Sequence, residues 1–374
     1  MSEPITLLAG KDLRVARGGS LLLDVPTLSI SAGETLALIG PNGAGKTTLL
    51  QCLGHLLKPF TGDLAFKGRR VGGEQSLFAY RRMIAMVFQE PLLFDTTVFA
   101  NCASGLRIRG MKRDTIKAIV MENLNRFGIK HLSKRSARTL SGGEAQRTSL
   151  ARAFAIAPEV LFLDEPFAAL DPPSRETLIA DLEQVLARTR TTTVIATHDR
   201  LEALRLSDRI AVMARGRILQ IGPPEEVMNK PADEFVAAFV GVETIIEGSV
   251  VNQEGGSLIV QVSGSEKTIE AVGEVQVGEQ VALCIRPEQV LLSTTLTPEA
   301  TSARNVFPGR IVRMVPLGLY YRVQLDCGFP LVAYVTNHAH DALALRVDTT
   351  VKASFKATAI HVVRRSRRKG KTAE

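Results

Sequence analysis

The sequence predicts an α/β domain with a mainly parallel sheet, followed from about residue 243 by an all-β domain. Two apolar runs, residues 160–163 and 193–197, are typical of fully buried strands. Helix-favouring segments alternate with them, and this alternation indicates a parallel sheet whose functional residues follow the carboxyl ends of the strands. Beyond residue 243, short runs of alternating polarity are separated by glycine-containing turns, at the spacing of small β-barrels.

Changes in composition along the chain give the expected domain boundaries. We place the α/β domain at residues 1–242, with a helical and more basic insertion at about 91–150. Two small β units, 243–294 and 295–364, are expected to follow in tandem. Residues 365–374 form a basic tail, which is typical of a solvated chain end but also suits contact with anionic lipid or nucleic acid.

A glycine-rich stretch within the α/β domain has the pattern of a phosphate-binding loop. From Gly40 to Thr47 it fits G-x-x-x-x-G-K-[ST], and it lies between an apolar run and leucines at helical spacing. Lys46 then reaches the β- and γ-phosphates of a nucleotide, and the Thr47 hydroxyl ligates Mg²⁺. A chance match in a glycine-rich turn is the alternative, and the strand–turn–helix context disfavours it. The predicted nucleotide-binding residues are Gly40, Pro41, Asn42, Gly43, Ala44, Gly45, Lys46, Thr47 and Thr48.

Composition excludes several other classes of protein. No apolar run approaches the roughly 18–20 residues needed to cross a bilayer, and we expect no signal peptide at the N-terminus. The four cysteines are scattered without a C-x-x-C pair, so neither a disulfide framework nor a zinc site is expected. A reduced cytosolic compartment is the simplest interpretation.

Five further features follow the loop in a characteristic order. They are Gln89, the run Leu-Ser-Gly-Gly-Glu at 140–144, Asp164-Glu165 after a hydrophobic strand, Asp171 and His198. Together with the loop they have the order and spacing of an ATP-binding cassette (ABC) subunit. The sequence resembles that family over residues 5–242, and the resemblance implies a P-loop NTPase fold and ATP hydrolysis with Mg²⁺.

The resemblance assigns a role to each of these polar residues. Glu165 is similar to the general base that polarises the attacking water, and His198 to the switch histidine that contacts the γ-phosphate. Asp164 is expected to hold Mg²⁺, directly or through water, opposite Thr47. Gln89 is expected to contact the same metal site and to link the phosphate to a membrane partner.

The run at 140–144 implies a dimer. Ser141, Gly142 and Gly143 are similar to the signature loop of the family, which contacts ATP bound to the opposite subunit, and Asp171 is expected beside that nucleotide. A homodimer that encloses two ATP molecules follows from the resemblance. The family also implies integral-membrane permease subunits, a periplasmic or surface substrate-binding protein, and a peripheral location on the cytoplasmic face of the inner membrane.

One departure from the family concerns the adenine base. Family members stack adenine on an aromatic residue about thirty positions before the phosphate-loop lysine, but the first aromatic residue here is Phe60. Arg17 lies at about the right distance, and a guanidinium plane also stacks on bases. We therefore hypothesise that Arg17 replaces the aromatic residue, with weaker selection for adenine.

The all-β region resembles the regulatory, oligonucleotide/oligosaccharide-fold-like (OB-like) domains of bacterial importer ATPases. Its second half is similar to small molybdate- and tungstate-binding domains, in the segments 302–305, 309–310 and 355–358. Hydroxyls, backbone N–H groups and cations suit a tetrahedral dianion. Ordinary strand-end residues of a β-barrel are the alternative interpretation. The predicted oxyanion ligands are Ser302, Ala303, Arg304, Lys356 and Thr358.

The favoured interpretation is an importer ATPase for molybdate or tungstate, with a C-terminal domain that senses the oxyanion and separates the cassettes. Sulfate, ferric iron, a polyamine or a sugar remains an alternative cargo. A cassette protein that acts on nucleic acid is less consistent with a single cassette, so no nucleic-acid partner is expected. A non-catalytic oxyanion store is disfavoured by Glu165 and His198.

Overall fold

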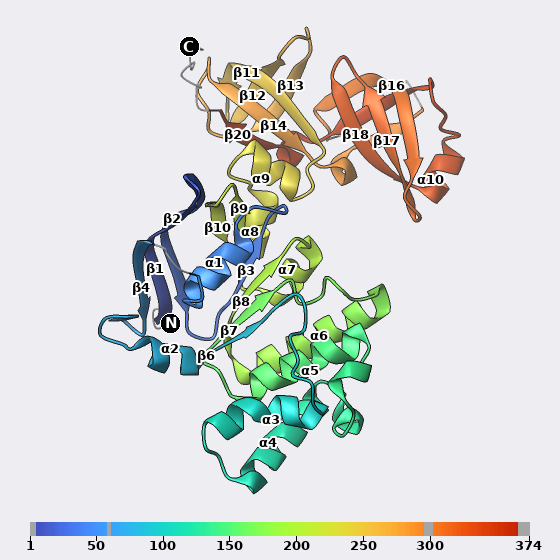
Figure 1. The fold of residues 1–374 in the computed structure, drawn as a ribbon. Coiled ribbons are helices and arrows are strands. Elements are labelled where there is room, and N and C mark those ends of the chain that lie inside the picture. The colour runs from blue at the N-terminus through green and yellow to red at the C-terminus, as the bar shows by residue number, and fades with distance from the viewer. Residues whose placement is uncertain (1–4, 58–60, 295–301, 366–374) are drawn as a thin grey trace. The chain divides into compact units, whose positions relative to one another are not determined.

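The computed structural model describes residues 5–57, 61–294 and 302–365, and the chain forms two compact units. Unit 1 comprises Met1–Pro224 and unit 2 comprises Glu225–Glu374. Figure 1 shows their elements, and each unit is described by itself.

Unit 1 is built around a six-stranded sheet in the order β10-β9-β3-β8-β7-β6. Five neighbouring strands run parallel, and only β10 pairs antiparallel, with β9. Every residue of β3, β7 and β8 is buried, as expected of strands covered on both faces. The predicted α/β fold with a mainly parallel sheet is confirmed. The strands are β3 (Thr35–Ile39), β6 (Ile84–Val87), β7 (Val160–Asp164), β8 (Thr192–Thr197), β9 (Arg209–Ala214) and β10 (Arg217–Gly222).

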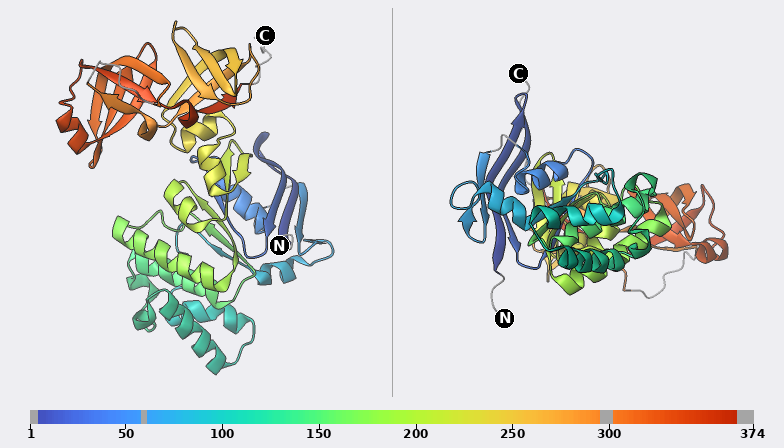
Figure 2. Two further views of the ribbon diagram at one scale, coloured as in Figure 1. Left: turned by 180° about the vertical axis from the view of Figure 1, so that it is seen from behind. Right: turned by 60° about the horizontal axis from the view of Figure 1, so that its bottom comes forward.

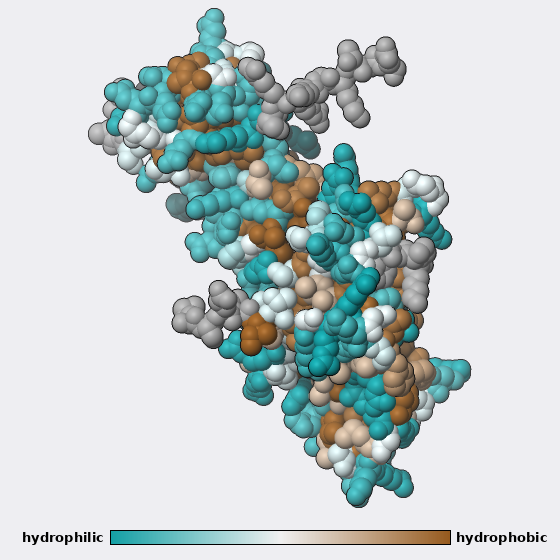
Figure 3. Space-filling model, turned by 90° about the vertical axis from the view of Figure 1, so that its left-hand side faces the viewer, coloured by the Kyte–Doolittle hydropathy of each residue, from teal (hydrophilic) through white to brown (hydrophobic). Residues whose placement is uncertain are grey.

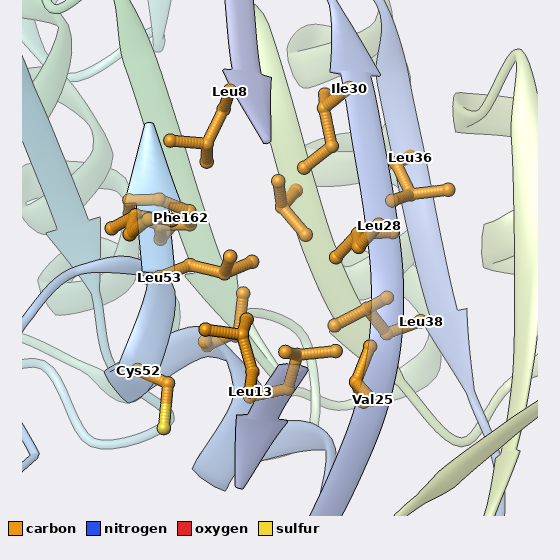
Figure 4. Packing of buried hydrophobic residues seen from close by; sticks show 14 of the residues in the cluster. Leu8, Leu13, Val25, Leu28, Ile30, Leu36, Leu38, Cys52, Leu53 and Phe162 are labelled. Carbon is orange, nitrogen blue, oxygen red and sulfur yellow. The ribbon is translucent and has the colours of Figure 1, made fainter. Parts of the chain in front are cut away.

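A second, antiparallel sheet of four strands has the order β2-β1-β4-β5. Its strands are β1 (Thr6–Arg17), β2 (Ser20–Ser31), β4 (Thr61–Phe66) and β5 (Arg69–Arg70). Apolar side chains from this sheet, from α1 (Lys46–Leu53) and from the parallel sheet form one buried cluster. Figure 4 shows part of it, where Leu8 and Leu13 of β1 lie near Leu53 of α1 and Phe162 of β7. This packing holds α1, the helix after the phosphate loop, against the two sheets of unit 1.

Helices fill the chain between β6 and β7. Three of them, α3, α4 and α5, gather in one body, as Figures 1 and 2 show from different sides. Two other helices follow β7 and β8 in turn. The helices of unit 1 after α1 are α2 (Leu77–Met83), α3 (Val98–Ile108), α4 (Arg113–Arg126), α5 (Gly142–Ala155), α6 (Pro172–Thr189) and α7 (Arg200–Leu206), with short 3₁₀ turns at Lys130–Leu132 and Ala137–Thr139.

Unit 2 contains two antiparallel five-stranded sheets, so the predicted all-β region is confirmed. The first sheet has the order β13-β12-β11-β14-β20 and the second the order β15-β19-β16-β17-β18. The strands are β11 (Thr244–Glu254), β12 (Ser257–Val262), β13 (Thr268–Val272), β14 (Gln280–Ile285), β15 (Leu291–Ser293), β16 (Asn305–Pro316), β17 (Tyr320–Asp326), β18 (Pro330–Thr336), β19 (Thr350–Phe355) and β20 (His361–Arg364).

The two sheets exchange strands, in contrast to the expected tandem arrangement of 243–294 and 295–364. β15 leaves the first segment to pair with β19, and β20 returns from the second segment to pair with β14. Buried residues of both sheets also belong to a single cluster, which includes Ile246 of β11 and Phe307 of β16. The two halves therefore share one core.

Two short helices, α8 (Pro224–Asn229) and α9 (Glu234–Phe239), precede the first of these sheets. Residues 225–242 were placed in the first domain by sequence, whereas the compact units divide between Pro224 and Glu225. The reason is packing: Ala237 and Val242 form a small buried cluster with Ala282, Cys284 and Val363 of the first β sheet of unit 2.

The surface is mixed in polarity (Figure 3), and the four cysteines are free thiols, as expected from the scattered cysteines in the sequence. Hydrophilic and apolar residues are interspersed on the face drawn in Figure 3. Within the described ranges, no helix combines the length and apolar character that a membrane span requires. Cys52, Cys102, Cys284 and Cys327 are free and buried, and burial raises the pKa of each thiol to about 12.

Candidate nucleotide and oxyanion sites

The predicted phosphate loop joins the carboxyl end of β3 to the N-terminus of α1. Two of its glycines are required by the backbone. A Cβ at Gly40 would lie 2.3 Å from the carbonyl oxygen of Met213 in β9, and Gly45 caps α1 with φ of 100°. The first amides of a helix have no partner within it, and the helix dipole adds partial positive charge there. The end of this loop is therefore suited to an anion such as phosphate.

The Lys46 side chain folds back over this loop. Its Nζ donates to the carbonyl oxygens of Gly40 at 2.8 Å and Pro41 at 3.4 Å. The same Nζ lies 3.4 Å from a carboxylate oxygen of Glu165, which follows β7. The ammonium thus lies between the loop and the Glu165 carboxylate at the end of β7, where the terminal phosphates of a nucleotide would carry negative charge.

Thr47 and Asp164 form the second link between α1 and β7. The Thr47 hydroxyl donates to Asp164 Oδ1 at 2.9 Å. Burial is the main cause that raises the pKa of the Asp164 carboxyl, and the Thr47 hydrogen bond opposes it. A hydroxyl and a carboxylate side by side are hard oxygen ligands, which fit Mg²⁺. No group of three or more His, Cys, Asp or Glu in the described part of the chain could hold a metal alone, and nucleotide-bound Mg²⁺ needs only one or two protein ligands.

Glu165 contacts two predicted site residues at once. One carboxylate oxygen faces Lys46, and the other lies 2.8 Å from His198 Nδ1. The Glu165 backbone has φ of 46°, in the left-handed region that is costly for residues other than glycine. Its N–H nevertheless donates to the carbonyl oxygen of Ala196 in β8 at 2.9 Å, which holds this geometry. The carboxylate is therefore oriented by the structure, as a general base requires.

Gln89 lies at the same edge of the sheet, two residues beyond β6. The register of β6 on β7 pairs Val87 with Leu163, so the chain after Val87 runs beside Asp164 and Glu165. The Gln89 side chain is exposed. Printed contacts thus join Asp164 and Glu165 to Thr47 and Lys46 of the loop, and His198 to Glu165, whereas Gln89 is placed only by its position after β6.

Ser141 and Asp171 cap two neighbouring helices. The Ser141 hydroxyl accepts from Glu144 N at 3.3 Å and the Glu144 carboxylate accepts from Ser141 N at 2.8 Å, a capping box at the start of α5. Asp171 caps α6 and accepts from Ser174 N at 3.1 Å. Hydrogen bonds from Ser174 lower the pKa of the Asp171 carboxyl.

The signature-like segment packs against the Asp171 segment. A Cβ on Gly142 would be 3.7 Å from Ala169 O, and one on Gly143 would lie 3.7 Å from Leu170 and 3.8 Å from Ser174. Arg17 is exposed at the tip of the β1–β2 hairpin, where it pairs with Ser20. Neither segment is joined to the phosphate loop by a contact described above, so their predicted roles toward ATP stay predictions.

A partly buried ion-pair cluster beside His198 was missed by the sequence analysis. Arg175 of α6 contacts both Asp199 and Glu202, which follow His198 in the chain. The available signal was an arginine four residues after the Asp171 cap, combined with two acidic residues after the next strand. Neither pattern specifies a contact until the helices are placed.

The predicted oxyanion residues lie in the two segments at one end of the β16–β19 pair. Asn305 pairs with Phe355, so Arg304 and Lys356 are each one residue beyond the same rung. Ser302 precedes β16, and Thr358 lies in the 3₁₀ turn Ala357–Ala359 after β19. Four of these five side chains are exposed, and the fifth, Ala303, is half-buried.

Asn305 belongs to the segment 302–305, but the sequence predicted no role for it. It is 2% exposed, and its amide exchanges two 2.8 Å hydrogen bonds with the backbone of Glu270. This side chain ties the start of β16 to the first sheet, because an unpaired buried amide would be costly.

The parallel sheet and its phosphate loop define unit 1 as a P-loop nucleoside-triphosphate-binding protein. The family model for the ABC transporter matches residues 23–168, and that for the TOBE domain matches residues 301–362. The chain is also similar to the solved structure of cbiO1 from Clostridium perfringens, described as part of the ABC transporter complex cbiONQ. That likeness has a TM-score of 0.55 at 31% identity and covers 64% of this chain and 95% of the other.

Curated relatives match most of the chain. The molybdate/tungstate import ATP-binding protein WtpC of Pyrococcus horikoshii is 38% identical, over 90% of this chain and 94% of its own length. The spermidine/putrescine import ATP-binding protein PotA of Treponema pallidum is 36% identical, over 84% of each. The chain belongs to the ABC transporter family, in the same group as these import ATP-binding proteins. It binds ATP and is an ATPase, with a C-terminal TOBE domain.

The position of Glu165 yields a test of its role. We predict that Glu165→Gln lowers kcat for ATP hydrolysis by about 10²- to 10⁴-fold, because the amide does not accept a proton from water. ATP affinity should stay close to that of the wild type, because the amide keeps the shape of the side chain. Steady-state ATPase and calorimetric ATP binding measure the two quantities. Glu159→Gln, which changes a carboxylate paired with Lys67 just before β7, is the control; equal losses in both variants would contradict the assignment.

Arg17 yields a second test. Arg17→Ala should weaken ATP binding by about 1 kcal/mol, a roughly fivefold rise in Kd, and should alter the ATP/GTP affinity ratio, because stacking depends on the base. Arg14→Ala, on the same strand but paired with Asp24 at 3.1 Å, is the matched control. Unchanged affinity and ratio in Arg17→Ala, measured by nucleotide titration, would remove Arg17 from the base site.

Proposed function

We propose that this chain is the ATPase of an importer for molybdate or tungstate, and that its TOBE domain binds the same oxyanion. The observation that carries the cargo proposal is the register of β16 on β19, which brings Arg304 beside Lys356. The similarity to the molybdate/tungstate import proteins of Pyrococcus horikoshii, Pyrococcus abyssi and Thermococcus kodakarensis, at 37–40% identity, supports it.

In the proposed cycle, the phosphate loop and Lys46 hold the nucleotide phosphates. Thr47 and Asp164 hold Mg²⁺, with Gln89 beside them, and this cation neutralises phosphate charge when it is bound. Glu165 accepts the proton of the attacking water, and His198, 2.8 Å from it, contacts the γ-phosphate. The link between Lys46 and Glu165 supports this arrangement, because it places the base beside the group that binds the terminal phosphates.

The ATPase is proposed to act as a homodimer. Gly142 is exposed and Gly143 half-exposed at the start of α5, where helix amides are available to an anion. In a dimer of the family type, Ser141–Gly143 of one copy would complete the nucleotide site of the other, with Asp171 beside it. The permease subunits, a periplasmic or surface substrate-binding protein and a peripheral position at the cytoplasmic face of the inner membrane belong to the same proposal.

The charge of the C-terminal site favours an oxyanion over the other cargoes. Arg304 and Lys356 are cations, and the Ser302 and Thr358 hydroxyls supply donors, so the set suits a tetrahedral dianion. A polyamine or Fe³⁺, the substrates in the names of other relatives, carries positive charge that these residues would repel. Sulfate, named for another relative, has the same shape and charge as molybdate and is the nearest alternative.

Sensing of the oxyanion extends the proposal. The ligand would inhibit import if it bound more tightly to the arrangement with separated cassettes than to the ATP-closed one.

The cargo proposal is tested by titrating the full chain with molybdate, tungstate and sulfate in a calorimeter. We expect saturable binding of molybdate and tungstate, with sulfate at least about tenfold weaker. Lys356→Ala should weaken binding of both preferred ions by about tenfold or more, because it removes a charge-assisted hydrogen bond worth roughly 1.5–3 kcal/mol.

Arg346→Ala is the matched control, since this exposed arginine precedes β19 and Lys356 follows it. Absence of binding for all three ions would contradict the C-terminal site. Preference for sulfate would replace the proposed cargo.

A further inference from the structure

Arg175 is the centre of a closed set of side-chain contacts around His198. Its Nε and Nη2 donate to Glu202 Oε1 at 2.9 and 2.6 Å, and Nη2 also donates to Asp199 Oδ2 at 2.5 Å. Glu202 is 4% exposed, so this carboxylate relies on the guanidinium to balance its charge.

Thr197, the residue before His198, completes this set of contacts. The Thr197 hydroxyl donates to the second carboxylate oxygen of Glu202 and accepts from the backbone N–H of Asp199 at 3.0 Å. Thr197 is fully buried at the end of β8. The chain on both sides of His198 is therefore fixed, while the His198 side chain itself stays 55% exposed and reaches Glu165 at 2.8 Å.

The same arginine belongs to the first turn of α6. Its backbone N–H donates to the carbonyl oxygen of Asp171 at 2.9 Å, and Asp171 also caps the helix through Ser174. One side chain thus joins the Asp171 segment to the segment that carries His198. Covalent neighbours do not supply this connection, because Arg175 and His198 are 23 positions apart in the sequence.

We propose that Arg175 is a positioning residue for His198. It holds Thr197 and Asp199, through Glu202 and directly, so that the imidazole meets Glu165 and a γ-phosphate in one orientation. The proposal rests on the role of His198 in the proposed function. It concerns Arg175 and its partners, which have no part in that proposed function.

Only an arginine satisfies this geometry. The guanidinium reaches two carboxylates from a rigid fork, whereas a lysine would offer a single charged nitrogen on a flexible stem. Arg175→Lys therefore keeps the charge balance of Glu202 but loosens the hold on Asp199.

The test is a double-mutant cycle on the purified full-length chain with saturating Mg-ATP. Arg175→Ala should lower kcat by about ten- to a hundredfold, as misplacement of a reacting group does, with KM for ATP changed by less than about twofold. In a His198→Ala background the same substitution should lower kcat no further, because the group that Arg175 positions is gone. Arg175→Lys should recover part of the loss.

Arg205→Ala is the matched control. This arginine also bridges α7 to α6, through Glu176 at 2.8 Å and Glu183 at 3.1 Å, but it contacts neither Thr197 nor Asp199 in any bond described here. We expect its kcat to remain within about twofold of wild type, since exposed ion pairs contribute little. A loss equal to that of Arg175→Ala would indicate a general α6–α7 packing effect and overturn the proposal.

A measurement that does not depend on catalysis separates the positioning role of Arg175 from the proposed role of His198. In the chain labelled with ¹³C-histidine, the His198 ring signal is assigned by its loss in His198→Ala, and Arg175→Lys should shift or broaden it while leaving the other five signals in place. Glu202→Gln gives the same test if Arg175→Ala does not fold. An unchanged His198 signal, or multiplicative losses of kcat in the cycle, overturns the positioning role. A normal kcat in His198→Ala alone would instead overturn the proposed function of His198.

Discussion

The site in unit 1 depends on the parallel register of four strands. β6, β7, β8 and β3 all end at one edge of the sheet, and each delivers a polar residue or the phosphate loop there. The register of β7 on β8 opposes Asp164 to Ala196, so the residues after each strand, Glu165 and His198, come within hydrogen-bond distance. A shift of either strand would separate them, because the side chains of successive residues point to opposite faces.

Antiparallel pairing achieves a similar result in unit 2. The segments around Arg304 and Lys356 are about fifty residues apart in sequence, yet the β16–β19 register makes them neighbours. The exchange of β15 and β20 between the sheets makes the unit a single body with a shared core.

A second layer of polar residues supports both sites. Arg175 holds the segment that carries His198, and Asn305 ties the start of β16 to the backbone of Glu270. Asn305 and the Glu202 carboxylate that Arg175 contacts are buried, where an unpaired polar group is costly because the dielectric is low.

The sequence by itself determined the fold class, the phosphate loop and the identity of the acidic and histidine residues that follow the strands. These are local properties, since a strand–glycine turn–helix pattern and buried apolar runs depend on neighbours along the chain. Tertiary structure alone decided the strand exchange in unit 2, the division at Pro224, the left-handed backbone of Glu165 and the contacts of Arg175. Each of these depends on residues distant in sequence, because antiparallel partners and the acceptors of a long side chain are fixed only when the elements pack. The missing aromatic residue before Phe60 was visible in the sequence, whereas the exposure of Arg17 at a hairpin tip required the fold.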